Sequence, residues 1–254
     1  MVYKLAVGAL FKNEGHVMKE WIEHYLFHGV EHFYLIDDGS TDFGVAILKP
    51  YVDRGLVTLF TSDCDYYLGR QRDLYNRFVL PRLKETEWLL MCDLDEFVWS
   101  PAYVDLRVPL GAAAHIGQIQ IEHTLFGSAG LAENPPSVVG AYVMRARESP
   151  TRSPGLRKYF VNSRFSITSL NVHHASFERL EDEKNHFILD ETCFQLNHYC
   201  CQSREFWWLV KCHRGDVNNW RVRTMADFDE VDQNDVEDCG LKMQNGPVID
   251  GLRE

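Results

Sequence analysis

Apolar and amphipathic stretches alternate along residues 1–100, and this alternation constrains the fold more than any other feature of the sequence. Four apolar runs are long and continuous enough to be strands buried on both faces: 4–11, 32–36, 56–60 and 88–92. The stretches between them that have helical spacing are about 15–28, 42–52 and 70–80, with Pro81 ending or kinking the last. This β-α-β-α-β-α-β order predicts an α/β fold in which a mostly parallel sheet has helices on both faces.

The sequence after residue 100 has a mixed pattern. Shorter strands are expected at 116–123, 140–146 and 163–170, and they predict a small antiparallel extension of the sheet. Residues 203–215 read as a helix with an apolar face, and the acid-rich 225–240 as a surface helix or tail. No linker marks a boundary, so a single domain is expected.

Composition excludes some classes of protein. With 254 residues, of which 45% are hydrophobic, the chain can bury a substantial core, and its formal charge of −11 argues against a nucleic-acid binder. The seven cysteines form no CxxC pair, which favours reduced thiols and a cytoplasmic, reducing compartment. The apolar run near the N-terminus is shorter than a signal peptide requires, and no stretch approaches the roughly 20 apolar residues of a membrane span, so we expect a soluble protein without a transmembrane segment.

Polar side chains follow the predicted strands. Because parallel strands end at one edge of a sheet, these clusters are expected to converge on a ligand site. Three clusters lie just past strand ends: Lys12, Asn13 and Glu14 after the first strand, Asp37 and Asp38 after the second, and Asp93 and Asp95 after the fourth. Gln71 and Arg72, in GRQRD at 69–73, are further candidates.

Asp93 and Asp95 supply the oxygen ligands that Mg²⁺ and Mn²⁺ prefer, with substrate phosphates completing the coordination. A metal would also neutralise the charge of three carboxylates within the four residues 93–96. The alternative is a solvated turn or acids at a helix start.

The other clusters also have two interpretations. Asp37 and Asp38 suit a base or ribose hydroxyls, although Ser40 or Thr41 of the same loop could cap the next helix, with Asp42 in its first turn. Asn13, Gln71 and Arg72 could read a pyrimidine edge, and Glu14 could be an acid in a first helical turn.

A second set of candidates carries positive charge or imidazole rings, as a diphosphate requires. Since neighbours on a strand face opposite ways, only one of His173 and His174 is expected to point into a site. The set comprises Arg157, Lys158, His173, His174, His198, Lys211 and Arg214.

These blocks together resemble a GT-A fold glycosyltransferase, close to glycosyltransferase family 92 and the related family 2-like group. The matching blocks are FKNEGHVMKEWIEHYLFHGVEHFYLIDDGSTD at 11–42, WLLMCDLDEFVWSP at 88–101, HTLFGSAG at 123–130, RKYFVNS at 157–163 with the VHHAS that follows, and NHYCCQSREFWWLVKCHRGD at 197–216.

The resemblance implies a nucleotide-sugar donor, a divalent metal, usually Mn²⁺, and inversion at the anomeric carbon. It implies that Asp37 and Asp38 bind the nucleoside and that Asp93 and Asp95 hold the metal and donor. One of His173 and His174 would lie near the metal, and Lys158, Lys211 and Arg214 near the diphosphate. Gln202-Ser203 stands where the family commonly has Lys-Ser, which removes one expected cation. In the single domain 1–254, residues 1–100 would bind the nucleotide, 101–220 would bind the acceptor and close on the diphosphate, and 221–254 would be an acidic C-terminal segment.

We therefore expect a metal-dependent inverting glycosyltransferase that moves sugar from a nucleotide sugar, most simply a UDP-sugar, to a hydroxyl of a glycan or glycoconjugate. The candidates for the base are Glu122, Glu178, Asp182 and His198, with preference for the acids of 178–182 because they follow the metal histidine. One alternative is a sugar nucleotidyltransferase, which needs a glycine-rich basic loop where this chain has FKNEG. The other is a non-catalytic binding module of the same fold, against which the intact DxD argues.

Overall fold

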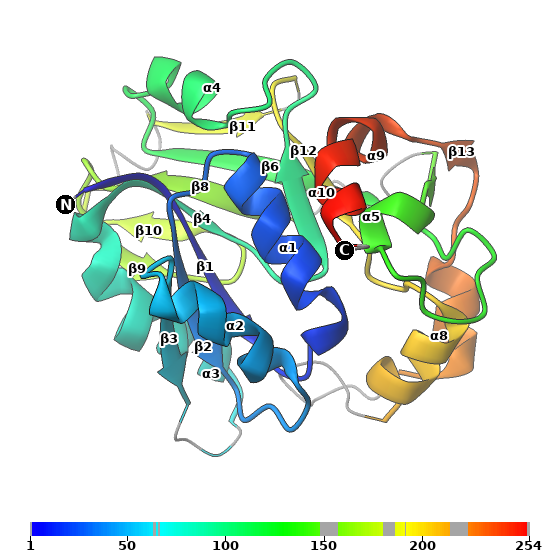
Figure 1. Ribbon diagram of the computed structural model, residues 1–254. Helices are drawn as coiled ribbons and strands as arrows, with labels where there is room; N and C mark the ends of the chain where they lie inside the picture. Colours follow the sequence, from blue (N-terminus) through cyan, green and yellow to red (C-terminus); the bar gives the residue numbers. More distant parts are fainter. Residues whose placement is uncertain are drawn as a thin grey trace.

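The computed structural model describes residues 2–62, 65, 67–147, 157–179, 186–190, 192–213 and 223–252. Two predicted site residues, Asp182 and Arg214, lie outside these ranges. Within them the chain forms one large sheet with helices against it (Figure 1). None of the described helices combines the length and the apolar character that a membrane crossing requires.

The large sheet joins a parallel half to a mixed half. Its strand order is β3 (Val57–Thr61), β2 (His32–Asp37), β1 (Tyr3–Phe11), β4 (Thr86–Met91), β8 (Arg157–Asn162), β6 (Gln118–Leu125), β12 (Gln195–His198) and β5 (Glu96–Trp99), and β11 (Phe187–Asp190) also pairs with β6. Strands β3, β2, β1 and β4 are parallel, whereas β8 runs antiparallel to both β4 and β6. Because β12 is parallel to β6, strands β1, β2, β4, β6 and β12 all end at the same edge. The predicted α/β fold with a mostly parallel sheet and an antiparallel extension is confirmed.

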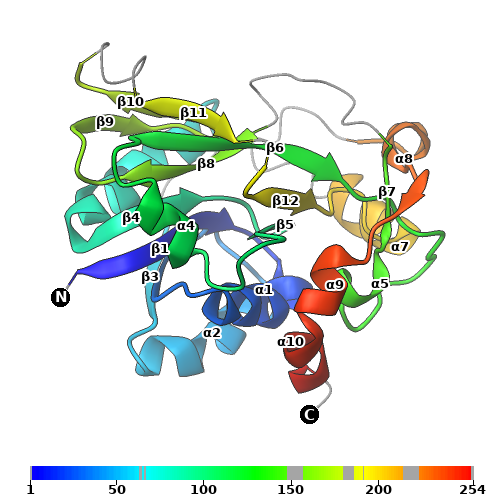
Figure 2. The ribbon, with the colours of Figure 1, turned by 90° about the horizontal axis from the view of Figure 1, so that it is seen from above.

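Both faces of the parallel half are covered, which explains the continuous apolar runs. Along β1, Leu5 and Val7 belong to the core under helices α1 (Gly15–Phe27) and α2 (Gly44–Asp53). Ala6 and Leu10 point the other way, into a core with Leu74. That second layer consists of α3 (Arg70–Leu74), the π-helix η1 (Tyr75–Val79) and the 3₁₀-helix η2 (Leu80–Glu85). Figure 2 shows α1 and α2 together on one side of the sheet.

Four regions differ from simple expectation. The strand predicted over 140–146 is the end of helix α5 (Val138–Ala141) followed by the two-residue strand β7 (Met144–Arg145). The helix predicted over 70–80 begins as α-helix, widens to a π-helix, and becomes 3₁₀ where Pro81 lies. The helix predicted over 203–215 is α7 (Arg204–Phe206) followed by the π-helix η3 (Trp207–Lys211). The acid-rich segment contains α8 (Met225–Val231) and β13 (Val236–Glu237), and β13 pairs with β7. The remaining elements are α4 (Arg107–Ala112), β9 (Ile167–Leu170), β10 (Ala175–Phe177), α9 (Gly240–Gln244) and α10 (Gly246–Gly251).

Candidate active site

A tight acidic turn joins β4 to β5 at the edge where the parallel strands end. The Glu96 side chain closes the turn, since its Oε2 accepts a hydrogen bond of 2.7 Å from the backbone N–H of Asp93. Helix α1 holds the turn from outside: Trp21 Nε1 donates to the carbonyls of Asp93 (3.1 Å) and Glu96 (3.0 Å). One carboxylate oxygen from each of Asp93, Asp95 and Glu96 lies within 4.8 Å of the others. The turn therefore gathers three acids around one point.

Lys158 supplies positive charge to this turn. Its Nζ lies 2.6 Å from Asp93 Oδ2 and 3.5 Å from Glu96 Oε2, and its side chain is 1% exposed. The register explains its place, because Tyr159 pairs with Met91 and puts Lys158 just beyond the last residue of β4. Burial acts to lower the pKa of Lys158, but the two carboxylates outweigh burial and raise that pKa well above its ordinary value. Lys158 is therefore a buried ammonium.

Two histidines connect Asp95 to Glu96. His198 Nε2 lies 3.6 Å from Asp95 Oδ1, the Nδ1 atoms of His198 and His123 are 3.1 Å apart, and His123 Nε2 lies 3.1 Å from Glu96 Oε1. A single proton can lie between the two Nδ1 atoms, so one ring donates and the other accepts.

The pKa shifts assign those roles. Burial acts to lower the pKa of His198, but Asp95 raises it to about 9. Burial and the neighbouring His198 lower the pKa of His123 to about 4. Burial acts to raise the pKa of Glu96, yet Lys158 and His123 hold it at about 2. At neutral pH His198 is thus an imidazolium that donates Nδ1–H to neutral His123, whose Nε2–H faces the Glu96 carboxylate.

Lys211, on η3, is the third cation of the site. Its Nζ lies 3.4 Å from Asp95 Oδ2 and 5.8 Å from the centre of the Phe206 ring. Burial acts to raise the pKa of Asp95, but Lys211 and His198 together bring it well below its ordinary range. Asp95 is therefore a carboxylate that faces two cations.

The acids at the carboxyl end of β2 already have partners within the protein. Asp38 forms a two-pronged ion pair with Arg70, in which Nη1 lies 2.7 Å from Oδ2, and both side chains are almost fully buried. Arg70 also donates to Ser62 Oγ at 2.7 Å. Asp37 Oδ1 accepts a 2.9 Å hydrogen bond from the backbone of Ser40 and so closes its own loop.

Asn13 and Asp42 join the loop after β1 to the loop after β2. Asn13 adopts a positive φ of 54°, and its Oδ1 accepts a 2.7 Å hydrogen bond from the backbone of Thr41. The Asp42 carboxylate accepts from the N–H groups of Gly15 (2.8 Å) and Gly44 (3.0 Å), the first residues of α1 and α2. Asp42 therefore serves both helix starts from outside them. The prediction of a Ser40 or Thr41 cap with Asp42 in the first turn is wrong, because α2 begins only at Gly44.

The structure separates the remaining candidates for nucleotide or metal binding. Gln71 reaches the acidic turn, with Nε2 3.3 Å from Asp93 Oδ1, whereas Arg72 is exposed and pairs with the neighbouring Asp73.

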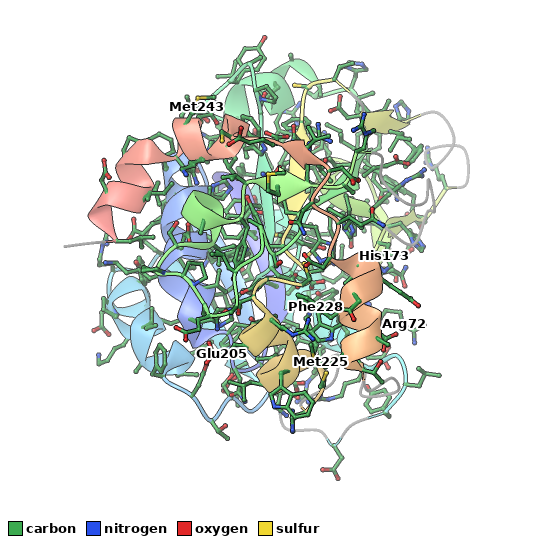
Figure 3. All side chains as sticks on the ribbon, turned by 90° about the vertical axis from the view of Figure 1, so that its right-hand side faces the viewer. Arg72, His173, Glu205, Met225, Phe228 and Met243 are labelled. Atoms are coloured by element: carbon green, nitrogen blue, oxygen red, sulfur yellow. The ribbon has the colours of Figure 1, made fainter. Side chains whose placement is uncertain are left out.

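His173, in the turn between β9 and β10, is half-buried, and its pKa is lowered by burial and by nearby Lys158. His174 is exposed. His173 is thus the inward member of the pair. Figure 3 labels Arg72 and His173. Lys12 and Glu14 lie half-buried in the loop after β1.

The candidate bases also lie in different places. Glu122 is in an ion pair with Arg157, with 2.9 Å between Oε1 and Nη2. Glu178 is exposed and follows Phe177, whose ring packs beside Gly117 at the amino end of β6, the edge opposite the acidic turn. Of the described candidates, His198 is the one that contacts this turn.

Sequence reasoning assigned no role to three residues of this region: Arg70, Glu96 and His123. Glu96 and His123 both stand in the blocks that carry the family resemblance, DLDE and HTLFGSAG. His123 meets His198 only because β6 pairs with β12, a contact between distant segments that the sequence does not signal. Arg70 and Arg72 carry the same charge two residues apart in GRQRD, so charge alone does not separate them.

Comparison with known proteins gives two curated relatives, and no family model matches the chain. A glycosyltransferase family 92 protein of Ricinus communis is 21% identical over 202 residues, and one of Arabidopsis thaliana is 22% identical over 218 residues. Each alignment covers 78% of this chain and 35% of the relative, so the chain spans about a third of the length of these proteins.

Among solved structures, S. aureus TarS in complex with UDP matches with a TM-score of 0.46 and 14% identity, covering 90% of this chain and 69% of that one. Its complex with UDP-GlcNAc matches with a TM-score of 0.45 and 15% identity, covering 98% and 71%. The curated relatives confirm what the motifs predicted, a resemblance to the family 92 glycosyltransferases over most of this chain.

Proposed function

We propose that this chain is a metal-dependent, inverting glycosyltransferase that moves a sugar from a nucleotide sugar, most simply a UDP-sugar, to a hydroxyl of a glycan or glycoconjugate. One observation carries the proposal. The acidic turn at the end of β4 holds three carboxylates and is ringed by Lys158, Lys211 and protonated His198. The similarity to glycosyltransferase family 92 proteins supports the same reaction.

The charges of the turn suit a metal and a diphosphate that enter together. Among the residues that the structure describes at this turn, three carboxylates face three cations. A divalent cation adds two positive charges, and the diphosphate of a nucleotide sugar carries two negative ones. Binding both keeps the site balanced, whereas binding either alone leaves a half-buried charge uncompensated, which is costly. The proposal therefore requires binding of nucleotide and metal to be coupled.

The side chains present fit Mn²⁺ or Mg²⁺. Asp93 and Asp95 offer hard oxygen donors within 4.8 Å of each other, and the Asp93 side chain is 33% exposed, so a ligand can reach it. Glu96 already accepts from the Asp93 backbone and faces His123, so we assign it to holding the turn. Asp93 and Asp95 would hold the metal, which would supply Lewis-acid stabilisation of the diphosphate.

The chain's own cations serve the leaving group. Breaking the bond between the sugar and the diphosphate places negative charge on the departing oxygen, and Lys211 and His198 lie beside Asp95 where that oxygen would be held. The acceptor hydroxyl attacks from the opposite side of an oxocarbenium-like sugar, which inverts the anomeric carbon. Because His198 is already protonated, we assign it to charge stabilisation and not to taking the proton of the acceptor.

Thermal unfolding with UDP or GDP, each with and without Mn²⁺, tests the coupling. The expected result is a midpoint that rises only when nucleotide and metal are both present, since a ligand that binds only the native state stabilises it. Asp95→Asn should abolish the rise, and Asp73→Asn, an exposed carboxylate paired with Arg72, should keep it. Equal stabilisation of wild type and Asp95→Asn would refute the proposal. With the better nucleotide known, release of free nucleoside diphosphate from a panel of its sugars tests transfer.

A further inference from the structure

The acid-rich C-terminal segment is built against the helix that carries Lys211. The Trp207 side chain, at the start of η3, donates from Nε1 to the carbonyl of Thr224 at 2.8 Å. Its ring also meets Phe228 of α8 nearly edge-on, with ring centres 5.7 Å apart. Trp207 is 2% exposed and Phe228 4%. The segment is thus part of the packed structure and not a solvated tail.

The carbonyl that Trp207 binds is itself fixed. Thr224 caps α8 in a capping box: its hydroxyl accepts from the backbone N–H of Asp227 at 3.3 Å, and its own N–H donates to Asp227 Oδ2 at 2.7 Å. A capped first turn holds the Thr224 carbonyl at the position where the indole N–H meets it.

Trp207 and Lys211 are the first and last residues of the same short π-helix, which the 2.9 Å hydrogen bond from Cys212 N–H to the Trp207 carbonyl closes. Trp207 and Phe228 pack with Cys201 in a small hydrophobic cluster that is separate from the two larger cores. Because η3 is only one turn long, the position of Trp207 sets where the backbone of Lys211 lies, and from there the ammonium reaches Asp95.

The other end of α8 is tied to the loop that follows β6. Asp232 accepts two hydrogen bonds from Ser128, one from its backbone N–H (2.6 Å) and one from its hydroxyl (2.9 Å). Asn234 Oδ1 accepts from the backbone of Ala129 at 2.8 Å, and a side chain at Gly127 would strike this amide. Phe228 lies on α8 between Thr224 and Asp232 in the sequence, and Figure 3 labels it.

We propose that α8 is a positioning element for the diphosphate contact of Lys211: Phe228 and Thr224 seat Trp207, and Asp232 anchors α8 to the β6 loop. The inference rests on the proposed function, since it requires Lys211 to contact the diphosphate. Phe228 and Asp232 are positioning residues, because they act on the ligand through η3.

The test compares Mn²⁺-dependent binding of UDP and of UMP by calorimetry. Lys211 would contact the second phosphate, so Lys211→Met should weaken UDP about tenfold and leave UMP nearly unchanged. Phe228→Ala should show the same selective loss, and the double variant Phe228→Ala/Lys211→Met should lose little more than Lys211→Met alone. Leu110→Ala, a buried residue of α4 in the main core, is the control for general destabilisation and should bind both nucleotides as wild type does.

If Phe228→Ala does not fold, Asp232→Asn tests the inference in its place, because it keeps the size of the side chain. This variant should show a smaller selective loss of affinity for UDP. Suppose that Lys211→Met binds UDP more weakly, whereas the folded Phe228→Ala or Asp232→Asn variant binds UDP as the wild type does. That result would overturn the positioning role and leave the proposed function standing. Equal losses for UDP and UMP would also overturn it. Unchanged UDP affinity in Lys211→Met would remove the diphosphate contact and the inference with it. No binding of any nucleotide to the wild type would refute the proposed function itself.

Discussion

The ammonium nitrogen of Lys158 lies 2.6 Å from Oδ2 of Asp93, at the point where a buried strand ends in a cluster of acids. The sequence of this turn demands nearby positive charge, and Lys158 supplies part of it. Asp93 therefore has a partner before any metal binds. A metal held by Asp93 would therefore bind next to an existing ion pair, and not at a carboxylate that lacks a counter-charge.

Lys158→Met removes that partner and leaves the carboxylates of Asp93 and Glu96 close together. Loss of one member of a buried pair should lower the free energy of unfolding by about 3–5 kcal/mol. Mn²⁺ should restore more stability to this variant than to the wild type, because the metal then becomes the main counter-charge. Urea unfolding with and without Mn²⁺ measures both effects.

Lys49→Met is the matched control for that experiment, because its ammonium pairs with Asp53 on the surface and its side chain is 73% exposed. Such pairs contribute about 0–1 kcal/mol. Similar losses in Lys158→Met and Lys49→Met would show that Lys158 does not carry the charge balance of the turn.

Arg70 and Arg72 provide a second matched pair. Arg70→Met leaves the Asp38 carboxylate buried without its cation, and we expect a loss of about 3–5 kcal/mol in unfolding free energy. Arg72→Met breaks an exposed pair with Asp73 and should cost about 1 kcal/mol or less. Chemical denaturation measures the loss of unfolding free energy in both variants. Equal losses would argue against a structural role for the Asp38–Arg70 pair.

The parallel half of the fold was predictable because strands buried on both faces are apolar throughout, as in β1 and β2. Strands β5, β8 and β12 were not predicted. All three carry polar residues at the site edge, such as Glu96, Lys158 and His198, and β5 and β12 are also short. Asp93 and Asp95 could be placed because they directly follow a clear strand. His123 could not, because its partner His198 is distant in sequence and only the pairing of β6 with β12 brings them together.

The charge on His198 predicts a loss of stability at alkaline pH in the metal-free protein. Its folded-state pKa of about 9 lies above the ordinary value of 6.5, so its contribution is complete below pH 6.5 and disappears as the pH rises through 9. The loss should be on the order of 3 kcal/mol, because one pKa unit corresponds to about 1.4 kcal/mol. Urea unfolding of wild type and His198→Asn between pH 6.5 and 10 isolates this term. Parallel pH dependences in the two proteins would rule out the ion pair with Asp95.

Asp42 accepts hydrogen bonds at the starts of two helices. Its removal should therefore lower the unfolding free energy more than removal of an ordinary surface-loop residue. Its two carboxylate oxygens accept from the backbone N–H groups of Gly15 and Gly44. Loss of a helix-capping acceptor costs about 1 kcal/mol, so Asp42→Ala should lower the unfolding free energy by about 2 kcal/mol. Asp42→Asn keeps one side-chain oxygen and should lose about half as much, whereas Asp53→Ala, which removes only an exposed pair with Lys49, should change little. Denaturant midpoints of the three variants check this order. Equal stability of Asp42→Ala and Asp53→Ala would show that the two helix starts do not depend on Asp42.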